Sequence, residues 1–150
     1  MGLKALKAFA ATLDNLLEKR MRDNGENIAT EMRRRLESGG HVDTGALLNS
    51  IRSETERVNH ETTTRVYADA KSENGAMYAE FIEYGTGAAH GRPGGRAGTW
   101  RYKDRQGVWH TTDGMDADPF IEPSVNKVLT YLDRMIEEVT IDAIRYGRGN

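Results

Sequence analysis

Residues 6–40, LKAFAATLDNLLEKRMRDNGENIATEMRRRLESGG, decide the fold because their apolar side chains recur at helical spacing. Apart from the adjacent pair Phe9 and Ala10, the steps between them are threes, fours and one seven, which is the stripe of an amphipathic helix. Gly25 stands inside the seven-residue step, and because the stripe keeps its phase there, we predict one helix rather than two. Three consecutive arginines suit the negative pole of the helix dipole, and Gly39-Gly40 ends the helix. The apolar positions are Leu6, Phe9, Ala10, Leu13, Leu17, Met21, Ile28, Met32 and Leu36.

Two shorter helices and a hairpin are predicted between residues 43 and 84. Asp43-Thr44 is typical of a helix N-cap, and Leu47, Leu48 and Ile51 then share one face of a helix of about two turns. Residues 51–58 and 62–68 are rich in β-branched or alternating side chains around a polar connection, which predicts a β-hairpin. Residues 77–84 fit either a helical turn or one face of a strand, and we favour the helix.

The second half of the chain begins with a loop and ends with a helix. Six of the fourteen residues from 85 to 98 are glycine, so order in this loop is costly in entropy. Aromatic residues alternate over 99–102 and 108–111 around a polar connection that ends in glycine, which predicts a second hairpin. Pro123 suits the first position of a final helix, with Glu122 at the positive end of its dipole. The apolar stripe of this helix consists of Val125, Val128, Leu129, Leu132, Ile136, Val139, Ala143 and Ile144.

Together these elements predict one α+β domain spanning residues 1–150. We expect a long N-terminal helix, a short helix, two β-hairpins forming an antiparallel sheet, and a long C-terminal helix packed on that sheet. A flexible loop rich in glycine and arginine occupies about residues 85–98. The sequence contains no internal repeat and no domain linker.

Composition argues against several classes of function. The chain has no cysteine, and therefore no disulfide, thiolate metal site or cysteine nucleophile. Its net charge of −2 argues against a general nucleic-acid binder, which would normally be basic. No stretch approaches the roughly 18 apolar residues that span a membrane, so we expect a soluble intracellular product. Because only 37% of the residues are hydrophobic and 29% are charged, we expect part of the ordered surface to be covered by another subunit.

Three short stretches of the chain follow one another in a recognisable order. They are Val42-Asp43-Thr44-Gly45 with Leu48 and Ser50-Ile51, then Tyr78-Ala79 with Glu83-Tyr84-Gly85-Thr86, and then Ala117-Asp118-Pro119-Phe120 before the final helix. In this order and spacing the chain resembles the head–tail joining or tail-completion proteins of tailed bacteriophages, from the first helix to Ile144. It departs from the family pattern at His41, where members commonly have proline. The resemblance implies structural roles for Asp43, Thr44, Gly45, Tyr78, Glu83, Gly85, Thr86, Pro119 and Phe120, and none for the central loop and aromatic hairpin.

Readings of these residues as catalytic groups are weaker. Asp43-Thr44-Gly45 joins an acid to a hydroxyl, but an aspartic protease needs a second carboxylate in a matching site, and the chain has no second such triplet. The glycine loop lacks the Gly-Lys-Ser/Thr ending of a phosphate loop. The four histidines, at positions 41, 60, 90 and 110, form no metal-ligand motif. A hydrolase using Asp43, Thr44 and a histidine therefore ranks last, and we predict no catalytic residue, no cofactor and no metal.

Basic residues concentrate between Gly85 and His110. This segment holds five cations and one anion, a local net charge of +4, which leaves −6 for the rest of the chain. Aromatic residues alternate with the cations, a pattern that suits either a subunit interface or stacking on single-stranded nucleic acid. We favour the interface, with a nucleic-acid-binding module formed by residues 99–111 as the alternative. The candidate interface or DNA-facing residues are Arg92, Arg96, Trp100, Arg101, Tyr102, Lys103, Arg105 and Trp109.

The sequence and its resemblance predict a non-enzymatic virion protein of the phage neck, assembled in the host cytoplasm. Its task is geometric, because copies that pack head to tail around an axis close into a ring. The resemblance implies a ring of six copies, with head-closure or adaptor proteins on one side and tail-tube or tail-terminator proteins on the other. DNA in the channel is a further, passive contact. Whether the ring caps the tail tube or lies between that cap and the head-closure ring stays open.

Overall fold

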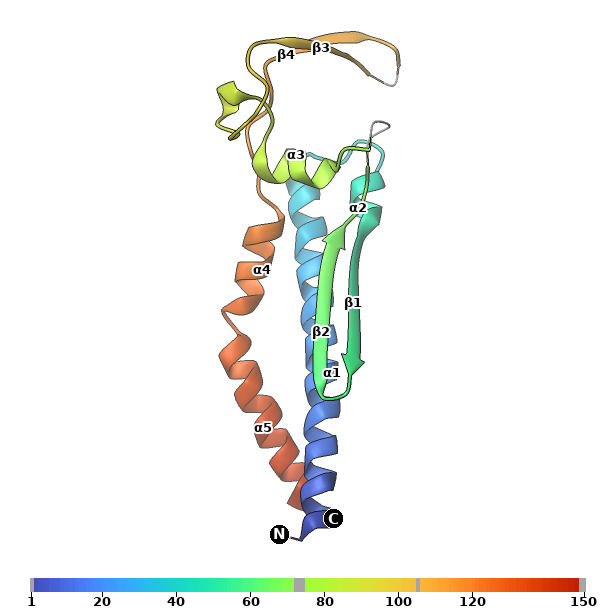
Figure 1. The fold of residues 1–150 in the computed structure, drawn as a ribbon, viewed down its shortest axis with the longest axis vertical. Coiled ribbons are helices and arrows are strands. Elements are labelled where there is room, and N and C mark those ends of the chain that lie inside the picture. Colours follow the sequence, from blue (N-terminus) through green and yellow to red (C-terminus); the bar gives the residue numbers. More distant parts are fainter. Residues whose placement is uncertain (1, 72–74, 105, 149–150) are drawn as a thin grey trace. The chain divides into compact units, whose positions relative to one another are not determined.

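The computed structural model describes residues 2–71, 75–104 and 106–148 and confirms the α+β class (Figure 1). The expected helices and hairpins are present, but the described strands form two separate two-stranded sheets, β1-β2 and β3-β4, instead of one sheet. The elements are α1 (Leu3–Ser38), α2 (Ala46–Ser50), β1 (Ile51–Val58), β2 (Glu61–Ala68), α3 (Tyr78–Tyr84), the 3-10 helix η1 (Ala88–His90), β3 (Trp100–Lys103), β4 (Trp109–Thr112), α4 (Ile121–Leu129) and α5 (Leu132–Arg148).

The chain divides into two compact units, and each hairpin belongs to a different one. The first unit comprises Met1–Arg33, Ile51–Tyr67 and Ser124–Asn150, and the second comprises Arg34–Ser50 and Ala68–Pro123. The two separate sheets therefore belong to different units. That residues 1–150 fold as a single domain stays a prediction.

Helix α1 is continuous through Gly25, as the phase of its apolar stripe predicted. The reason for this glycine is packing, because a Cβ atom at position 25 would overlap Ser53 Oγ and the methyl group of Thr64. Both residues belong to the β1-β2 hairpin of the same unit. Gly25 therefore marks a place where side chains of the hairpin pack directly against the helix backbone, and not a weak point in α1.

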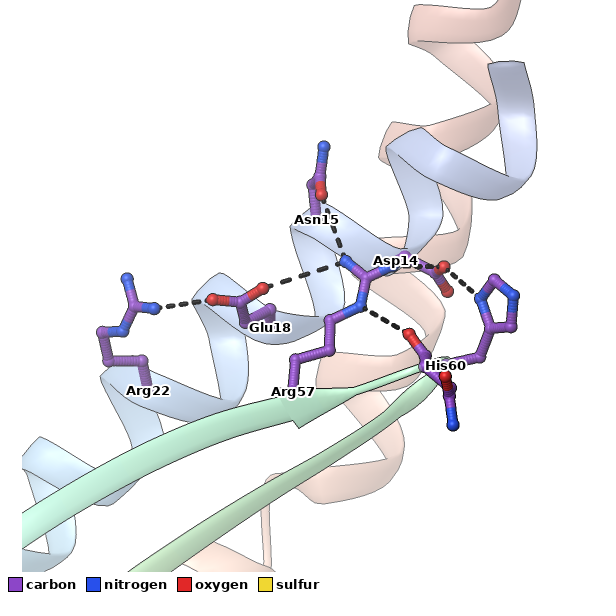
Figure 2. A network of polar contacts seen from close by, with 7 residues as sticks. Asp14, Asn15, Glu18, Arg22, Arg57 and His60 are labelled. Atoms are coloured by element: carbon purple, nitrogen blue, oxygen red, sulfur yellow. Dashed lines mark hydrogen bonds and ion pairs between the residues drawn. The ribbon is translucent and has the colours of Figure 1, made fainter. Parts of the chain in front are cut away.

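A polar network fastens the far end of this hairpin to α1 (Figure 2). The Arg57 guanidinium of β1 donates to Asp14 Oδ2 at 2.5 Å and to Asn15 Oδ1 at 3.2 Å. Nδ1 of His60, in the turn of the hairpin, lies 2.9 Å from the same Asp14 oxygen. Arg57 and Asp14 are mostly buried, so solvent screens their charges less than those of an exposed pair.

Helices α4 and α5 contact α1 within the first unit, whereas the sequence had suggested that the last helix packs on the sheet. Lys127 of α4 pairs with the buried Glu31 at 3.0 Å, and Glu138 of α5 lies 3.5 Å from Arg20. In Figure 1, α1 lies between the β1-β2 hairpin and α5. The hairpin and the C-terminal helices therefore use different sides of one central helix.

The C-terminal region is two helices, so the prediction of a single final helix was wrong. Thr130 and Tyr131 form a turn, in which Thr130 Oγ1 donates to the Lys127 carbonyl at 2.7 Å and the Tyr131 N–H donates to the Val128 carbonyl at 3.0 Å. A hydroxyl that bonds to the preceding turn competes with the regular helical ladder. The apolar stripe could not reveal this break, because Val128 and Leu132 keep helical spacing across it.

The buried face of α5 also differs from the predicted stripe. Met135, Val139 and Ala143 are buried, as was expected for the last two. Ile136 and Ile144, which the stripe placed in the core, are exposed by 50% and 40%. The stripe of α5 is wider than the face that this chain covers by itself.

The second unit contains α2, α3, η1, the β3-β4 hairpin and the loops between them. Helix α3 at Tyr78–Tyr84 confirms the helical reading of this ambiguous segment. The glycine-rich loop takes up defined turns: the Ala88 N–H donates to the Arg96 carbonyl, and the Gly95 N–H to the Arg92 carbonyl, both at 2.9 Å. The flexibility predicted for residues 85–98 stays a prediction.

Candidate interface sites

A buried carboxylate joins two of the three family stretches. Glu83, at the end of α3, is 5% exposed and accepts three backbone N–H groups where α4 begins. Glu83 Oε2 accepts from Phe120 at 2.9 Å and from Ile121 at 2.8 Å, and Oε1 accepts from Glu122 at 2.9 Å. The first N–H groups of a helix have no partner inside the helix, and a negative charge there also favours the helix dipole. Glu83 thus serves α4 as an N-terminal cap supplied from a distant part of the sequence.

The residues that follow Glu83 form backbone contacts with the stretch before α4. Thr86 and Met115 form an antiparallel bridge, with N–H to carbonyl distances of 2.9 and 3.1 Å. Gly85 has φ of 69°, and a Cβ atom there would meet the carbonyl oxygen of Met115 at 2.6 Å. The Asp118 N–H donates to the Ile82 carbonyl at 2.9 Å. We call residues 82–86 with 115–122 the clamp.

The remaining family stretch, Val42-Asp43-Thr44-Gly45, is linked to the clamp through the preceding residue, His41. His41 Nε2, next to Val42-Asp43-Thr44-Gly45, lies 2.8 Å from Asp118 Oδ2. Within the stretch, Thr44 Oγ1 accepts the Ala46 N–H at 3.3 Å, which forms a side-chain turn leading into α2. The second unit therefore brings together all three stretches that carried the resemblance.

Arg92 extends the clamp instead of lying free on the loop. Its Nη1 donates to the Gly85 carbonyl at 2.8 Å and to the Glu80 carbonyl at 3.3 Å, and Nη2 lies 3.6 Å from Glu80 Oε2. Its side chain is only 25% exposed. Of the predicted interface cations, this one is thus engaged inside the unit.

The β3-β4 hairpin carries its aromatic and basic residues on two faces. In the antiparallel register Arg101 pairs with Thr111, Tyr102 with His110 and Lys103 with Trp109. Because strand side chains alternate, Arg101, Lys103, Trp109 and Thr111 share one face, which we call the basic hairpin face. On it, the Arg101 guanidinium lies 5.0 Å and the Lys103 ammonium 5.8 Å from the centre of the Trp109 ring.

On the opposite face of the hairpin, the side chains contact one another or neighbouring residues of the same unit. Tyr102 stacks on His110 with the ring centres 5.2 Å apart, and Arg96 lies 5.4 Å from the centre of the Trp100 ring. His110 Nε2 is 2.7 Å from Asp104 Oδ2. Arg105, another predicted interface residue, lies outside the described residues.

The single acid of the basic segment is neutralised within the hairpin. Hydrogen bonds from His110 and from the Val108 N–H hold the pKa of Asp104 below its ordinary value of 3.8. Arg96, Arg101 and Lys103 form no ion pair with any residue that the structure describes. Trp109 is 56% exposed and Tyr102 49%. The basic hairpin face is therefore an exposed indole beside two cations that have no counter-charge among the described residues.

His90 ties the glycine-rich loop to Asp116 of the clamp and to Asp113, which precedes it. Its Nδ1 lies 2.7 Å from Asp116 Oδ1 and its Nε2 3.2 Å from Asp113 Oδ1. Carboxylates only accept, so an imidazolium that donates from both nitrogens satisfies this arrangement best. The hydrogen bond with Asp116, followed by that with Asp113, raises the pKa of His90 above 6.5. His90 in turn lowers the pKa of Asp113.

Residues 3–85 match the protein family described as "Bacteriophage HK97-gp10, putative tail-component". The chain belongs to this HK97-gp10-like family. The search of curated proteins found no match to the chain, and neither did the search of solved structures. Membership of a tail-component family confirms the predicted relationship and supports a structural role in the phage tail or neck.

The part matched to the HK97-gp10-like family runs from the start of α1 to Gly85, the glycine at the centre of the clamp. The half of the clamp at residues 115–122 and the basic hairpin face both lie beyond the matched part. Glu83 was expected to have a structural role only because of the family resemblance. No local sequence pattern indicated that Glu83 pairs with the start of α4, because Glu83 lies 37 residues before Phe120, the first residue whose N–H it accepts.

No feature of this family member's described residues points to catalysis. Among them, no group of three or more histidines and carboxylates is placed to hold a metal ion. The residues of the hydrolase reading have other contacts, since His41 bonds to Asp118 and Thr44 accepts from Ala46. None of the described helices combines the length and apolarity needed to cross a membrane. Family membership in a structural component favours a non-enzymatic role.

Proposed function

We propose that this protein is a ring-forming component of the phage neck, needed to join head and tail. The observation that carries the proposal is the match of residues 3–85 to the tail-component family. The clamp, the Arg57 network and the packing at Gly25 support it, because they give each unit internal rigidity without forming a reactive site. The proposed partners are further copies in a ring of six, a head-closure or adaptor protein, and a tail-tube or tail-terminator protein.

Exposed apolar and charged surfaces support a role in assembly. Trp109, Tyr102, Ile136 and Ile144 are large side chains that the described chain leaves 40–56% exposed. Aromatic and cationic groups of this kind are typical anchors of protein interfaces. Copies of one chain that meet through unlike surfaces form closed rings when the rotation between them closes.

Loss of the gene tests the proposal. A phage that lacks this gene, complemented with the wild-type gene or an empty plasmid, is scored by plaques and by electron microscopy of the lysate. We expect complete heads and separate tails without the gene, and joined particles with it. Tails of abnormal length would place the protein at the tail-tube cap, whereas tails of normal length would place it between that cap and the head. Joined, infectious particles without the gene would contradict the proposal.

The alternative is a nucleic-acid-binding module formed by residues 99–111. The unpaired cations beside Trp109 favour it, since cation–aromatic surfaces bind single strands by stacking and charge. Affinity of the purified protein for DNA that falls steeply with salt, and falls further in Trp109→Ala, would support this function.

A further inference from the structure

Helix α5 presents a second apolar face that the rest of the described chain does not cover. Met135, Val139 and Ala143 fill the covered face. Residues three and four positions apart lie on one side of a helix, so Asp133, Ile136, Glu137, Thr140 and Ile144 share a second side, next to the covered face. All five are exposed, and we call them the outer α5 face.

The acids of the outer α5 face have no counter-charge in the described chain. Glu138 and Asp142, elsewhere around the helix, pair with Arg20 and Arg145. Asp133 and Glu137 form no ion pair with the residues that the structure describes. The outer α5 face thus combines two exposed isoleucines with two unpaired carboxylates.

The basic hairpin face has the complementary chemistry. Arg101 and Lys103 supply two cations that form no ion pair in the described part of the chain, and Trp109 supplies an exposed indole next to both. Each surface therefore lacks what the other carries: an apolar cover and charges of the opposite sign.

We infer that the basic hairpin face of one copy binds the outer α5 face of the next copy. In this contact the Trp109 indole packs on the outer α5 face between Ile136 and Ile144, while Arg101 and Lys103 pair with Asp133 and Glu137. The two surfaces differ, so the contact is head to tail and repeats from copy to copy until the ring closes. The inference rests on the proposed ring and names the surfaces that build it.

A second copy suits both surfaces better than DNA does. DNA phosphates could neutralise Arg101 and Lys103, but they would leave the isoleucines wet and would repel Asp133 and Glu137. One pairing between copies covers both surfaces at once and needs no component besides this chain. Binding of DNA at the basic hairpin face is therefore an outcome that the test must separate.

Disulfide trapping tests the pairing, because the natural sequence has no cysteine to interfere. Thr111 lies on the basic hairpin face and Thr140 on the outer α5 face, and both are exposed. When purified Thr111→Cys and Thr140→Cys proteins are mixed and mildly oxidised, we expect a covalent dimer, and none from either variant alone. The matched control replaces Thr140→Cys with Arg52→Cys, an exposed position on β1, and should give little product.

Several trapping results would overturn the inference. A dimer from one variant alone would indicate a symmetric contact. Equal trapping with Arg52→Cys would indicate random collision. In the double variant Thr111→Cys with Thr140→Cys, a disulfide formed only within one chain would show that the hairpin covers its own α5.

Charge reversal gives a second, independent test. We expect the variant Arg101→Glu with Lys103→Glu to weaken self-association roughly tenfold or more, measured by analytical ultracentrifugation. Adding Asp133→Lys and Glu137→Lys to the same chain should restore much of the association, because the pairing then forms with exchanged signs. The control Lys4→Glu with Lys7→Glu makes the same change in net charge on α1 and should leave association unaltered.

These measurements separate the inference from the proposed function. Rings that persist in the Arg101→Glu, Lys103→Glu variant would overturn the docking surfaces and leave the neck role standing. Wild-type protein that stays monomeric and binds DNA through Arg101 and Lys103 would overturn the inference, and the gene-deletion experiment then decides the neck role by itself.

Discussion

Arg92 and Arg101 stand nine residues apart in the same basic segment, yet the structure uses them in opposite ways. Arg92 turns inward. Its guanidinium donates hydrogen bonds to the Gly85 and Glu80 carbonyls and lies beside the Glu80 carboxylate. Arg101 lies over the Trp109 ring and pairs with no carboxylate among the described residues. The first fastens a loop to the clamp, and the second leaves its charge for a partner.

The same contrast holds between the clamp and the basic hairpin face. In the clamp, Glu83, Gly85 and Thr86 satisfy backbone groups, so a substitution there should act on folding. On the basic hairpin face, Trp109 and Lys103 are exposed, so a substitution there should act on assembly. A charged side chain therefore indicates a binding surface only when its contacts inside the molecule are known.

The largest expected effect is on the clamp, at Gly85. We expect Gly85→Ala to lower the free energy of unfolding by at least about 3 kcal/mol, because a Cβ atom would overlap the backbone at Met115 and Ala117. Gly94→Ala is the matched control, since Gly94 has nearly the same positive φ but open space around it. It should cost only about 1–2 kcal/mol, the strain of the left-handed backbone. Equal losses in urea denaturation would show that the clamp adjusts freely.

The second effect concerns the cap on α4. Glu83→Ala leaves the N–H groups of Phe120, Ile121 and Glu122 without their acceptor, and we expect a loss of roughly 2–4 kcal/mol in the free energy of unfolding. Glu80→Ala, on the same helix but exposed, should change stability by less than about 1 kcal/mol. If both variants unfold at the same urea concentration, Glu83 does not hold α4 as described.

Two adjacent residues of α5 then test which face is covered. Met135 is buried and Ile136 is half exposed, so Met135→Ala should cost about 2–3 kcal/mol and Ile136→Ala under about 1 kcal/mol in the monomer. In the assembled state the order of the effects should change, because Ile136→Ala removes part of the proposed docking surface. Denaturation of the monomer and sedimentation of the oligomer provide the two measurements. A large loss of monomer stability in Ile136→Ala would mean that the chain covers this face itself.

The sequence predicted what depends on local periodicity. The stripe from Leu6 to Leu36 identified α1, including its continuity at Gly25, and the alternation around residues 59–61 identified the first hairpin. Gly25 itself could be explained only by the structure, because its role is to admit Ser53 and Thr64, which lie on other elements. Periodicity shows which side of a helix is apolar, but not how much of that side the same chain covers.

What the sequence missed depends on pairings between distant segments. Nothing near Glu83 shows that its carboxylate receives N–H groups at residues 120–122, and nothing near Arg92 shows that it bonds to carbonyls of α3 and Gly85. The prediction of one continuous final helix failed for another reason. The Thr130 hydroxyl bonds to the Lys127 carbonyl and competes with the helix, and an apolar pattern does not show such a hydrogen bond. The basic hairpin face was predicted correctly as a hairpin, but its two faces became distinct only once the register was known.

The smallest effect concerns the tie between His90 and the aspartates at 113 and 116. Because the pKa of His90 is raised in the folded protein, its contribution to stability is present below its unfolded value of 6.5 and is lost as pH rises through the folded pKa. The lowered pKa of Asp113 acts in the other direction, so that its contribution is present above 3.8 and is lost as pH falls through the folded pKa. The loop should therefore be held most firmly at mildly acidic pH, between these two transitions.

Titration of the His90 ring by NMR should give a pKa above 6.5, which falls more in Asp116→Asn than in Asp113→Asn, because the shorter contact is made with Asp116. Hydrogen exchange at residues 87–91 should become faster above the measured pKa, and this change should be absent in His90→Asn. A His90 pKa at or below 6.5, or exchange that does not respond to pH beyond its ordinary chemical dependence, would show that this tie does not hold the loop, and that the Arg92 contacts and the Thr86–Met115 bridge fasten it instead.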